Sequence, residues 1–200
     1  VGFGELLAGL GELRSLLVGK IGQALHFALD LALAKPGELA AVVPGRPAHA
    51  DDGKRDAFEA FAREAGCGYI RRRHNPHAKA GNINNALAQT TADYVATFDA
   101  DHVPVSTFLA ETLGFFRDSR VAQVQTAHHF YNPDLFQDRL KSQTYIANEQ
   151  DMFFHIVQPG RDVYNSSFYC GSGAVFRRSA LDEIGGLPMT TVTEDLHTSM

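Results

Sequence analysis

Hydrophobic and polar positions alternate in a regular way after residue 50. Apolar positions at helical spacing, followed by Gly66, predict a helix over residues 55–66, and the run CGYIR predicts a short strand at residues 67–71. The segment KAGNINNALAQT at residues 79–90 has the pattern of a helix with a polar, Asn-rich first turn. The run YVATFD at residues 94–99 has the pattern of a strand.

The same alternation continues to the end of the chain. It predicts a helix, a strand, a long helix opened by Asn-Pro, a strand-like segment broken by glycines, and a short helix, at residues 105–118, 121–126, 132–154, 168–178 and 179–186. Strands that alternate with helices predict an α/β fold with a largely parallel sheet. Ligands of such sheets bind at the carboxyl ends of the strands, which is where Asp99 and Asp101 stand.

Residues 1–50 differ in composition from the rest of the chain. More than half of them are Leu, Ala or Gly, and they include no Asn, Thr, Tyr or Cys. This change predicts an atypical N-terminal segment over 1–50 and a second unit over 51–200. A domain or linker boundary explains it, and so does a segment that is not native to the rest of the chain, through a reading-frame or assembly error. The apolar part at residues 16–34 is interrupted by charged residues and is predicted to form amphipathic helices, with no membrane span.

Composition and charge remove several classes of function. The chain is 44% hydrophobic and 20% charged, which is ordinary for a globular domain. A net charge of −5 argues against nucleic acid as a general partner. Two cysteines, Cys67 and Cys170, give neither a disulfide framework nor a CxxC pair, which suits a reducing compartment.

The segment FDADHVP places the carboxylates of Asp99 and Asp101 two residues apart at the end of a predicted strand. These carboxylates repel each other, so a positive group is expected beside them. One interpretation is a divalent cation, because carboxylate oxygens suit Mg²⁺ and leave positions for water and phosphate. The other is a structural salt bridge to an arginine. His102 would orient a ligand or cap the next turn.

Three further clusters suggest chemistry, and each also has a purely structural interpretation. The DDG segment at residues 51–53 is typical of a turn and a helix cap. Lys79 and Gly81 open a predicted helix, where a cation and free N–H groups suit a phosphate, and a solvated loop lysine has the same pattern. Glu194 and Asp195 open another helix, whose dipole favours an ionised carboxylate; this suits a general base and equally a plain capping sequence.

The order of these clusters is more informative than any one of them. Along the chain stand the segments DDG, HAKAGN, DADH, QTAHHFY, FYCGSG and TED. In this order and spacing, the residues from about Asp51 to Met200 resemble the processive family-2 glycosyltransferases, and most of all the catalytic domain of bacterial cellulose synthases. The resemblance implies an enzyme that uses a UDP-sugar. It implies the nucleotide-sugar-binding GT-A fold, Rossmann-like and here incomplete at both ends.

On the donor side, the resemblance implies roles for five residues. Asp51 and Asp52 match the aspartates that hold the uridine, and Lys79 matches the lysine beside the diphosphate. Asp99 and Asp101 match the D-x-D pair of the donor site, and we expect both to serve the metal site. The second aspartate of that pair coordinates the Mg²⁺ or Mn²⁺ that bridges the two phosphates.

On the acceptor side, the resemblance implies contacts with the growing glycan. Cys170, Gly171 and Ser172 match the segment that contacts the acceptor sugar, and Glu194 is expected to bind the acceptor as well. Asp195 matches the aspartate of T-E-D, the general base. Three residues of the QTAHHFY segment are expected near the donor pocket, with roles less defined: His128, His129 and Tyr131.

The chemistry of the family fits these residue types. A positioned carboxylate takes the proton of a sugar hydroxyl as the oxygen attacks the anomeric carbon. A divalent ion neutralises the charge on the leaving UDP. Attack from the face opposite UDP inverts the anomeric centre. The expected activity is therefore inverting transfer of a sugar to the non-reducing end of a growing β-linked polysaccharide. Likeness to cellulose synthases favours glucose.

The chain departs from the family pattern at both ends. Before DDG, the segment GRPAHA is not β-like, so the strand that leads to the uridine half of the pocket is expected to be poor. After Asp195, the family's Q-x-x-R-W motif and transmembrane helices are absent. We therefore expect a fragment, inactive alone, of a membrane synthase. The whole synthase would act at the cytoplasmic face of the bacterial inner membrane, with the missing transmembrane region as partner.

Other functions stay open on the sequence alone. Synthases for hyaluronan, chitin or mannan share most of these motifs. A soluble nucleotidyltransferase would also use paired aspartates and Mg²⁺, but its Gly-rich loop is matched only weakly by GFGELLAGLG. The chain could also bind a nucleotide sugar or a partner subunit without turnover. A metal-sequestering role would use the nine histidines, whose spacing gives no credible zinc site.

Overall fold

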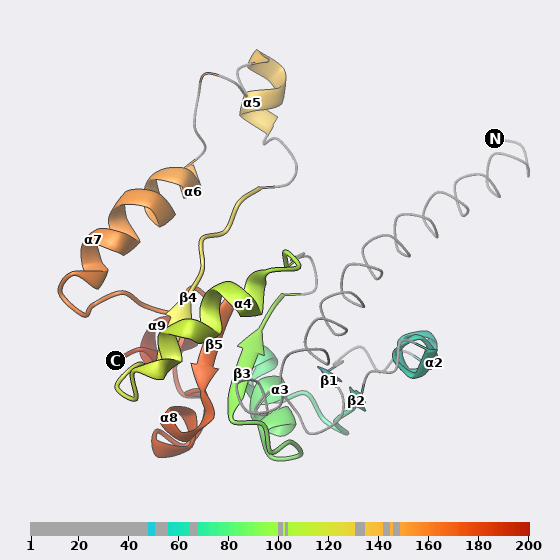
Figure 1. Cartoon of the computed structure of the whole chain (residues 1–200). Coiled ribbons are helices and arrows are strands. Elements are labelled where there is room, and N and C mark those ends of the chain that lie inside the picture. Colours follow the sequence, from blue (N-terminus) through green and yellow to red (C-terminus); the bar gives the residue numbers. More distant parts are fainter. Residues whose placement is uncertain are drawn as a thin grey trace, which may run out of the picture.

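Three short strands in the middle of the molecule form the sheet on which the candidate site rests. A computed structural model of the protein describes residues 48–50, 56–64, 68–99, 102, 104–130, 135–141, 145 and 149–200. Strand β5 (Ala174–Arg177) lies between β3 (Tyr94–Thr97) and β4 (Gln123–Gln125) (Figure 1). A separate sheet pairs β1 (Ala48–Ala50) with β2 (Gly68–Ile70) in parallel.

Helices alternate with these strands, as the sequence pattern predicts. Those that fall where they were predicted are α2 (Asp56–Glu64), α3 (Ala78–Leu87), α4 (Phe108–Leu113) with the 3₁₀ helix η1 (Gly114–Arg117), α8 (Arg178–Glu183) and α9 (Glu194–Thr198). The alternation of helices and strands confirms the α/β class. Within the described ranges, no helix has the length and apolar character needed to cross a membrane.

The side chains of β5 divide the core between the two faces of the sheet. Val175 packs with Phe108 and Leu109 of α4 on one face. Ala174 and Phe176 point to the other face, where they join a cluster that includes residues of α3 and α8. Alternate residues of a strand point to opposite faces, so one four-residue strand serves both layers. The sheet is thus covered by α4 on one side and by α3 and α8 on the other.

The direction of β5 corrects the prediction of a largely parallel sheet. It runs antiparallel to both of its neighbours, with Ala174 opposite Thr97 of β3 and Gln125 of β4. The alternating pattern suggested one helical crossover before each strand, but a long excursion over residues 126–173 separates β4 from β5. That excursion returns the chain to the carboxyl ends of β3 and β4, and β5 can only run back from there.

Two glycines make this entry possible. Gly171 and Gly173 have φ angles of 81° and 62°, a conformation that side chains other than glycine's rarely adopt. The backbone N–H of Gly173 donates to Thr97 (2.8 Å), and its carbonyl accepts from the N–H of Thr126 (3.0 Å). The predicted glycine break before the strand is confirmed, and it places the segment 170–173 at the carboxyl ends of β3 and β4.

Strand β1 contradicts the expectation that the segment GRPAHA would make a poor strand. Residues Ala48–Ala50 are extended and pair in register with Gly68–Ile70. The Asn82 side chain of α3 also donates to the carbonyl of Ala50 (3.1 Å). Alanine and histidine have weak strand propensity, so these tertiary hydrogen bonds decide the local structure. The predicted boundary at residue 50 stays a prediction.

The predicted single helix over residues 132–154 is wrong. Helix α5 (Leu135–Leu140) ends at Lys141, whose φ of 49° is left-handed and cannot continue an α-helix. A second helical stretch comprises α6 (Glu149–Met152), the π-helix η2 (Phe153–Val157) and α7 (Gln158–Asp162), and it extends well beyond the predicted end (Figure 1). The apolar spacing is helical as predicted, but the break is set by the backbone at Lys141.

The loop that leads into α3 is tightly constrained. The guanidinium of Arg72, only 7% exposed, donates to the carbonyls of Pro76 (2.7 Å) and Ala78 (2.8 Å). His77 and Ala78 have φ angles of 60° and 40°, a conformation that costs free energy in residues with a Cβ. This strain persists because Arg72 holds both sides of the turn. The fixed turn sets the direction in which the Lys79 side chain leaves the helix.

Gly81 is predicted to be essential for this packing. A Cβ at Gly81 would lie 2.2 Å from the Pro76 carbonyl oxygen and 2.6 Å from Arg72 Nη1, whereas a Cβ at Gly114 would meet nothing within 4 Å. We expect Gly81→Ala to lower the free energy of unfolding by roughly 1–3 kcal/mol. Gly114→Ala, the matched control, should leave it unchanged or raise it by up to about 1 kcal/mol. Urea unfolding measures both; equal effects of the two substitutions would contradict the packing described.

Candidate active site

The ammonium group of Lys79 stands at the junction of three chain segments. It donates to the carboxylate of Asp99, just after β3, and to the backbone carbonyl of Gly171, just before β5. Both charged side chains are partly exposed, at 31% for Lys79 and 41% for Asp99. The positive group expected beside Asp99 is therefore a lysine in this structure, where the sequence had suggested an arginine or a metal ion.

Asp195 lies on the other side of Gly171. A Cβ at Gly171 would be 3.7 Å from Asp195 Oδ2 and 3.8 Å from Lys79 Nζ, so both groups approach the same bare Cα. The second oxygen of Asp195 accepts the N–H of Leu196 (2.8 Å) in the first turn of α9. A side chain at position 171 would therefore meet both an ammonium and a carboxylate at van der Waals distance.

Ser172 ties this loop to the end of β3. Its hydroxyl, on a residue that is 1% exposed, accepts the backbone N–H of Asp99 (2.9 Å) and is hydrogen-bonded to Nδ1 of His102. His102 Nδ1 also lies 3.9 Å from Asp99 Oδ2. Because the N–H of Asp99 is a donor, the Ser172 hydroxyl hydrogen is free to point to His102.

His128 closes the site from the side of β4. Its ring packs between those of His102 (centroids 4.8 Å apart) and Phe154 (4.6 Å). Its Nε2 lies 2.8 Å from the carbonyl oxygen of Ser172, and since a carbonyl only accepts, Nε2 carries the hydrogen. Burial is the largest effect and lowers the pKa of His128 from its usual value, while the hydrogen bond to Ser172 opposes it. Smaller charge effects follow: His102 and Lys79 lower this pKa, and Asp99 raises it.

A buried tyrosine hydroxyl contacts the loop at Gly171. Tyr169, 1% exposed, donates to the carbonyl of Gly171 and lies 3.0 Å from the Thr97 hydroxyl. Burial is the main effect that raises the pKa of this phenol; the Thr97 hydrogen bond opposes it, and the carboxylates of Asp99, Asp195 and Glu194 raise it further. Three carboxylates therefore lie near enough to act on the same buried phenol.

The ligand types of these carboxylates fit a divalent cation. Carboxylate oxygens are the ligands that Mg²⁺ and Mn²⁺ prefer, and Asp99 keeps one oxygen that Lys79 does not bind. Asp101 lies outside the described residues. Among the residues that are described, no three His, Cys, Asp or Glu side chains come together as a metal site. A metal ion at Asp99 would therefore need ligands from outside the described side chains.

The structure thus brings together several of the residues predicted from the sequence. Lys79, Asp99, Gly171, Ser172, Asp195 and His128 share one site. His129 is apart from it, because its side chain is 76% exposed and faces Asp151 at 3.5 Å. Three predicted donor or metal residues, Asp51, Asp52 and Asp101, lie outside the described residues, as does Tyr131.

The sequence interpretation missed three polar residues that shape the site. Thr97 and Tyr169 are buried and bonded to each other, and Gln158 of α7 is 6% exposed beside Cys170. Thr97 sits in an apolar strand, and Gln158 lies just past the predicted end of a helix. Nothing in their local sequence marks them, since their role depends on contacts 10 or more residues away.

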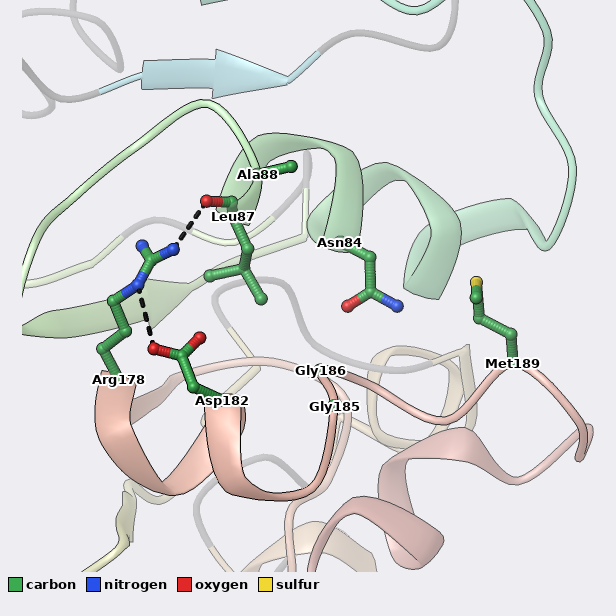
Figure 2. A pocket seen from close by; sticks show the side chains of 8 residues that line it. All are labelled: Asn84, Leu87, Ala88, Arg178, Asp182, Gly185, Gly186 and Met189. Atoms are coloured by element: carbon green, nitrogen blue, oxygen red, sulfur yellow. Dashed lines mark hydrogen bonds and ion pairs between the residues drawn. The ribbon is translucent and has the colours of Figure 1, made fainter.

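A separate cleft lies on the α3 and α8 side of the molecule. Its volume is about 290 Å³ (Figure 2). Within it, the Arg178 guanidinium donates to the carbonyl of Leu87 (2.6 Å) and forms an ion pair with Asp182 at 3.5 Å, so it already has partners. The lining residues are Asn84, Leu87, Ala88, Arg178, Asp182, Gly185, Gly186 and Met189. None of them is a predicted site residue.

The lowered pKa of His128 predicts a dependence of stability on pH. The unfolded chain protonates this imidazole near pH 6.5, while the folded chain does so only at lower pH. Its contribution to stability is therefore fully present above about pH 6.5 and is lost as the pH falls through the folded-state pKa. The difference in unfolding free energy between wild type and His128→Asn should shrink as the pH falls below 6.5. An NMR titration that places the His128 pKa at or above 6.5 would contradict the described environment.

Several known proteins are similar to this chain in sequence. The profile of glycosyl transferase family 2 matches residues 49–185. The chain is 50% identical over 151 residues to the UDP-forming cellulose synthase catalytic subunit of Pseudomonas fluorescens and 48% identical over the same length to that of Xanthomonas axonopodis pv. citri. Each alignment covers 75% of this chain. The chain spans only 20% and 21% of those relatives' length.

A solved structure gives the fold. The mannosyltransferase PcManGT from Pyrobaculum calidifontis, in complex with GDP-Man and Mn²⁺, superposes with a TM-score of 0.50 and 22% identity. The match covers 76% of this chain and 40% of that one. It agrees with the predicted GT-A fold. With two thirds of its residues matched by the family profile and half of the aligned residues identical to those of cellulose synthase subunits, the chain belongs to glycosyl transferase family 2.

Proposed function

We propose that this chain is part of a synthase that transfers a sugar, with glucose favoured, from a UDP-sugar to the non-reducing end of a β-linked polysaccharide with inversion. The observation that carries the proposal is the convergence of Lys79, Asp99 and Asp195 around Gly171. It occurs in a chain half identical, over the aligned residues, to UDP-forming cellulose synthase subunits. A diphosphate leaving group needs a cation, and a hydroxyl nucleophile needs a base; this site supplies one of each.

On the donor side, Lys79 would contact the diphosphate from the start of α3. Its ammonium is partly exposed, so an arriving phosphate can reach it, and Asp99 holds it in place meanwhile. We assign the uridine to Asp51 and Asp52, which follow β1 directly. The bond from Asn82 to the Ala50 carbonyl supports this assignment, because it ties the end of β1 to the helix that carries Lys79.

The divalent cation would be held by Asp101, with Asp99 beside it. When bound, Mg²⁺ or Mn²⁺ supplies positive charge at the diphosphate as UDP leaves. The three carboxylates that act on Tyr169 support this assignment, and the related fold of the mannosyltransferase is known with Mn²⁺ and a nucleotide sugar.

On the acceptor side, Asp195 would take the proton of the attacking sugar hydroxyl. Its Oδ2 faces the loop at Gly171 rather than the helix, since Oδ1 accepts the N–H of Leu196. Cys170, Gly171 and Ser172 would contact the acceptor sugar, with Glu194 next to the base. Inversion would then require the attacking hydroxyl and the leaving UDP to stand on opposite faces of the anomeric carbon.

The partners and the location belong to the same proposal. The chain would work with a glycan acceptor and with the transmembrane region of its own synthase, at the cytoplasmic face of the bacterial inner membrane. Its similarity to the synthase subunits of two bacteria supports this, over a fifth of their length.

Two substitutions distinguish the metal ligand from the base. We expect UDP to bind the wild-type chain more tightly with Mn²⁺ than without it. Asp101→Ala should abolish this enhancement, because it removes a metal ligand. Asp195→Asn should keep it within about twofold, because the base contacts the acceptor and not UDP. Isothermal titration calorimetry measures all three.

Two results would contradict the proposal. One is a folded wild-type chain that does not bind UDP with either Mg²⁺ or Mn²⁺. The other is the reverse pattern, in which Asp195→Asn loses the metal enhancement and Asp101→Ala keeps it.

A further inference from the structure

The loop before β5 is held from both sides by glutamine side chains, and we propose that Gln158 and Gln125 position Cys170 and its neighbours for the acceptor sugar. The inference rests on the proposed function, in which this loop contacts the acceptor. It assigns positioning roles to two residues that would not react themselves.

Gln158 binds the loop on the side of α7. Its Nε2 donates to the carbonyl of Phe168 (2.8 Å) and to the sulfur of Cys170 (3.0 Å). Its Oε1 accepts the backbone N–H of Phe168 (3.4 Å). The residue is 6% exposed, so water does not compete for these bonds. One amide thus pairs with the backbone of Phe168 as a neighbouring strand would, and it reaches the Cys170 thiol as well.

Gln125 binds the same loop on the side of β4. Its Oε1 accepts the backbone N–H of Cys170 (2.8 Å). Its Nε2 donates to the carbonyls of Ser172 (2.8 Å) and Gly173 (3.3 Å). The N–H and thiol of Cys170 are therefore held by two side chains that come from different elements. A loop with two left-handed glycines needs such bonds, because its backbone has few preferences of its own.

The geometry of the helix that carries Gln158 directs this side chain to the loop. The π-helical stretch η2 ends directly before Gln158, and such stretches shift the register of the side chains after them and are frequent at functional sites. Within η2, Phe154 packs on His128 (4.6 Å) and Phe153 on Phe168 (5.9 Å). These ring contacts hold the helix against both the site and the loop, in addition to the hydrogen bonds of Gln158.

These contacts separate the glutamine from the donor half of the site. The hydrogen bonds described for Gln158 all go to Phe168 and Cys170. Lys79, in contrast, binds the loop through the carbonyl of Gly171. Loss of the Gln158 amide should therefore weaken acceptor binding and leave donor binding unchanged. General damage to the fold would instead weaken both.

The test uses the single thiol of the loop as its probe. All proteins carry Cys67→Ser, so that iodoacetamide reports on Cys170 alone. Three quantities are measured: the pH profile of alkylation, its slowing by cellotetraose in the presence of UDP and Mn²⁺, and the affinity for UDP. Gln158→Met is compared with wild type and with Gln89→Met, a control in which the exposed glutamine bonds only locally to Asn85.

In Gln158→Met we expect the cellotetraose concentration that gives half protection to rise about tenfold, the effect of losing about one well-formed hydrogen bond. The UDP affinity should stay within about twofold of wild type. The alkylation profile should move to higher pH, because burial already raises the pKa of the Cys170 thiol and the Gln158 bond opposes that rise. Gln89→Met should match wild type in all three. Gln158→Asn, too short to reach Cys170, replaces Gln158→Met if circular dichroism shows that the latter is unfolded.

Two outcomes would overturn the inference. One is a folded Gln158→Met protein with wild-type protection and pH profile; the other is an equal loss of UDP affinity. Absence of cellotetraose protection in wild type would instead refute the proposed acceptor role. In that case the pH profile still decides whether Gln158 holds Cys170: a shift supports it, and no shift overturns it.

Discussion

The candidate site depends on one cation, the ammonium of Lys79. It joins the end of β3, through Asp99, to the loop before β5, through the carbonyl of Gly171. Asp195 approaches the same loop from α9, so the ammonium lies in a site that holds at least two carboxylates. The strained turn at His77 and Ala78, held by Arg72, sets the position of the lysine. Sequence segments nearly 100 residues apart therefore meet at one charged atom.

The second constraint is the antiparallel entry of β5 between β3 and β4. A parallel strand in that place would bring its carboxyl end to the site and its preceding loop to the opposite edge. Because β5 runs the other way, the segment 170–173 lies beside Asp99, and Ser172 can bond both Asp99 and His102. The side chains of β4 divide accordingly: Val124 enters the core, while Gln125 reaches the loop. The sheet has three strands, and the ends of all three at this edge contribute to the site.

Much of this arrangement could be predicted from the sequence, for reasons that are local. The period of the apolar residues located α3 and β3, the acidic pair Glu194 and Asp195 marked the start of α9, and the glycines before β5 marked the break in that strand. The direction of β5 could not be predicted, because it depends on the long excursion after β4. The end of α5 depends on a left-handed backbone at Lys141, a residue type that carries no such preference. Strand β1 forms against weak propensity through its partners. Gln158 looks like any helical glutamine until its contacts with Phe168 and Cys170 are seen.

The central claim is that a nucleotide and its metal bind at the carboxyl ends of β3 and β4, beside Lys79. Paramagnetic broadening by Mn²⁺ in the presence of UDP tests this claim most directly, because it locates the ion in the folded chain. The account predicts the strongest broadening at the amides of Asp99 and Gly171 and at the ring of His102, with weaker effects at Gly185 and Gly186 in the cleft between α3 and α8. Strongest broadening at that cleft, or equal broadening without UDP, would contradict it.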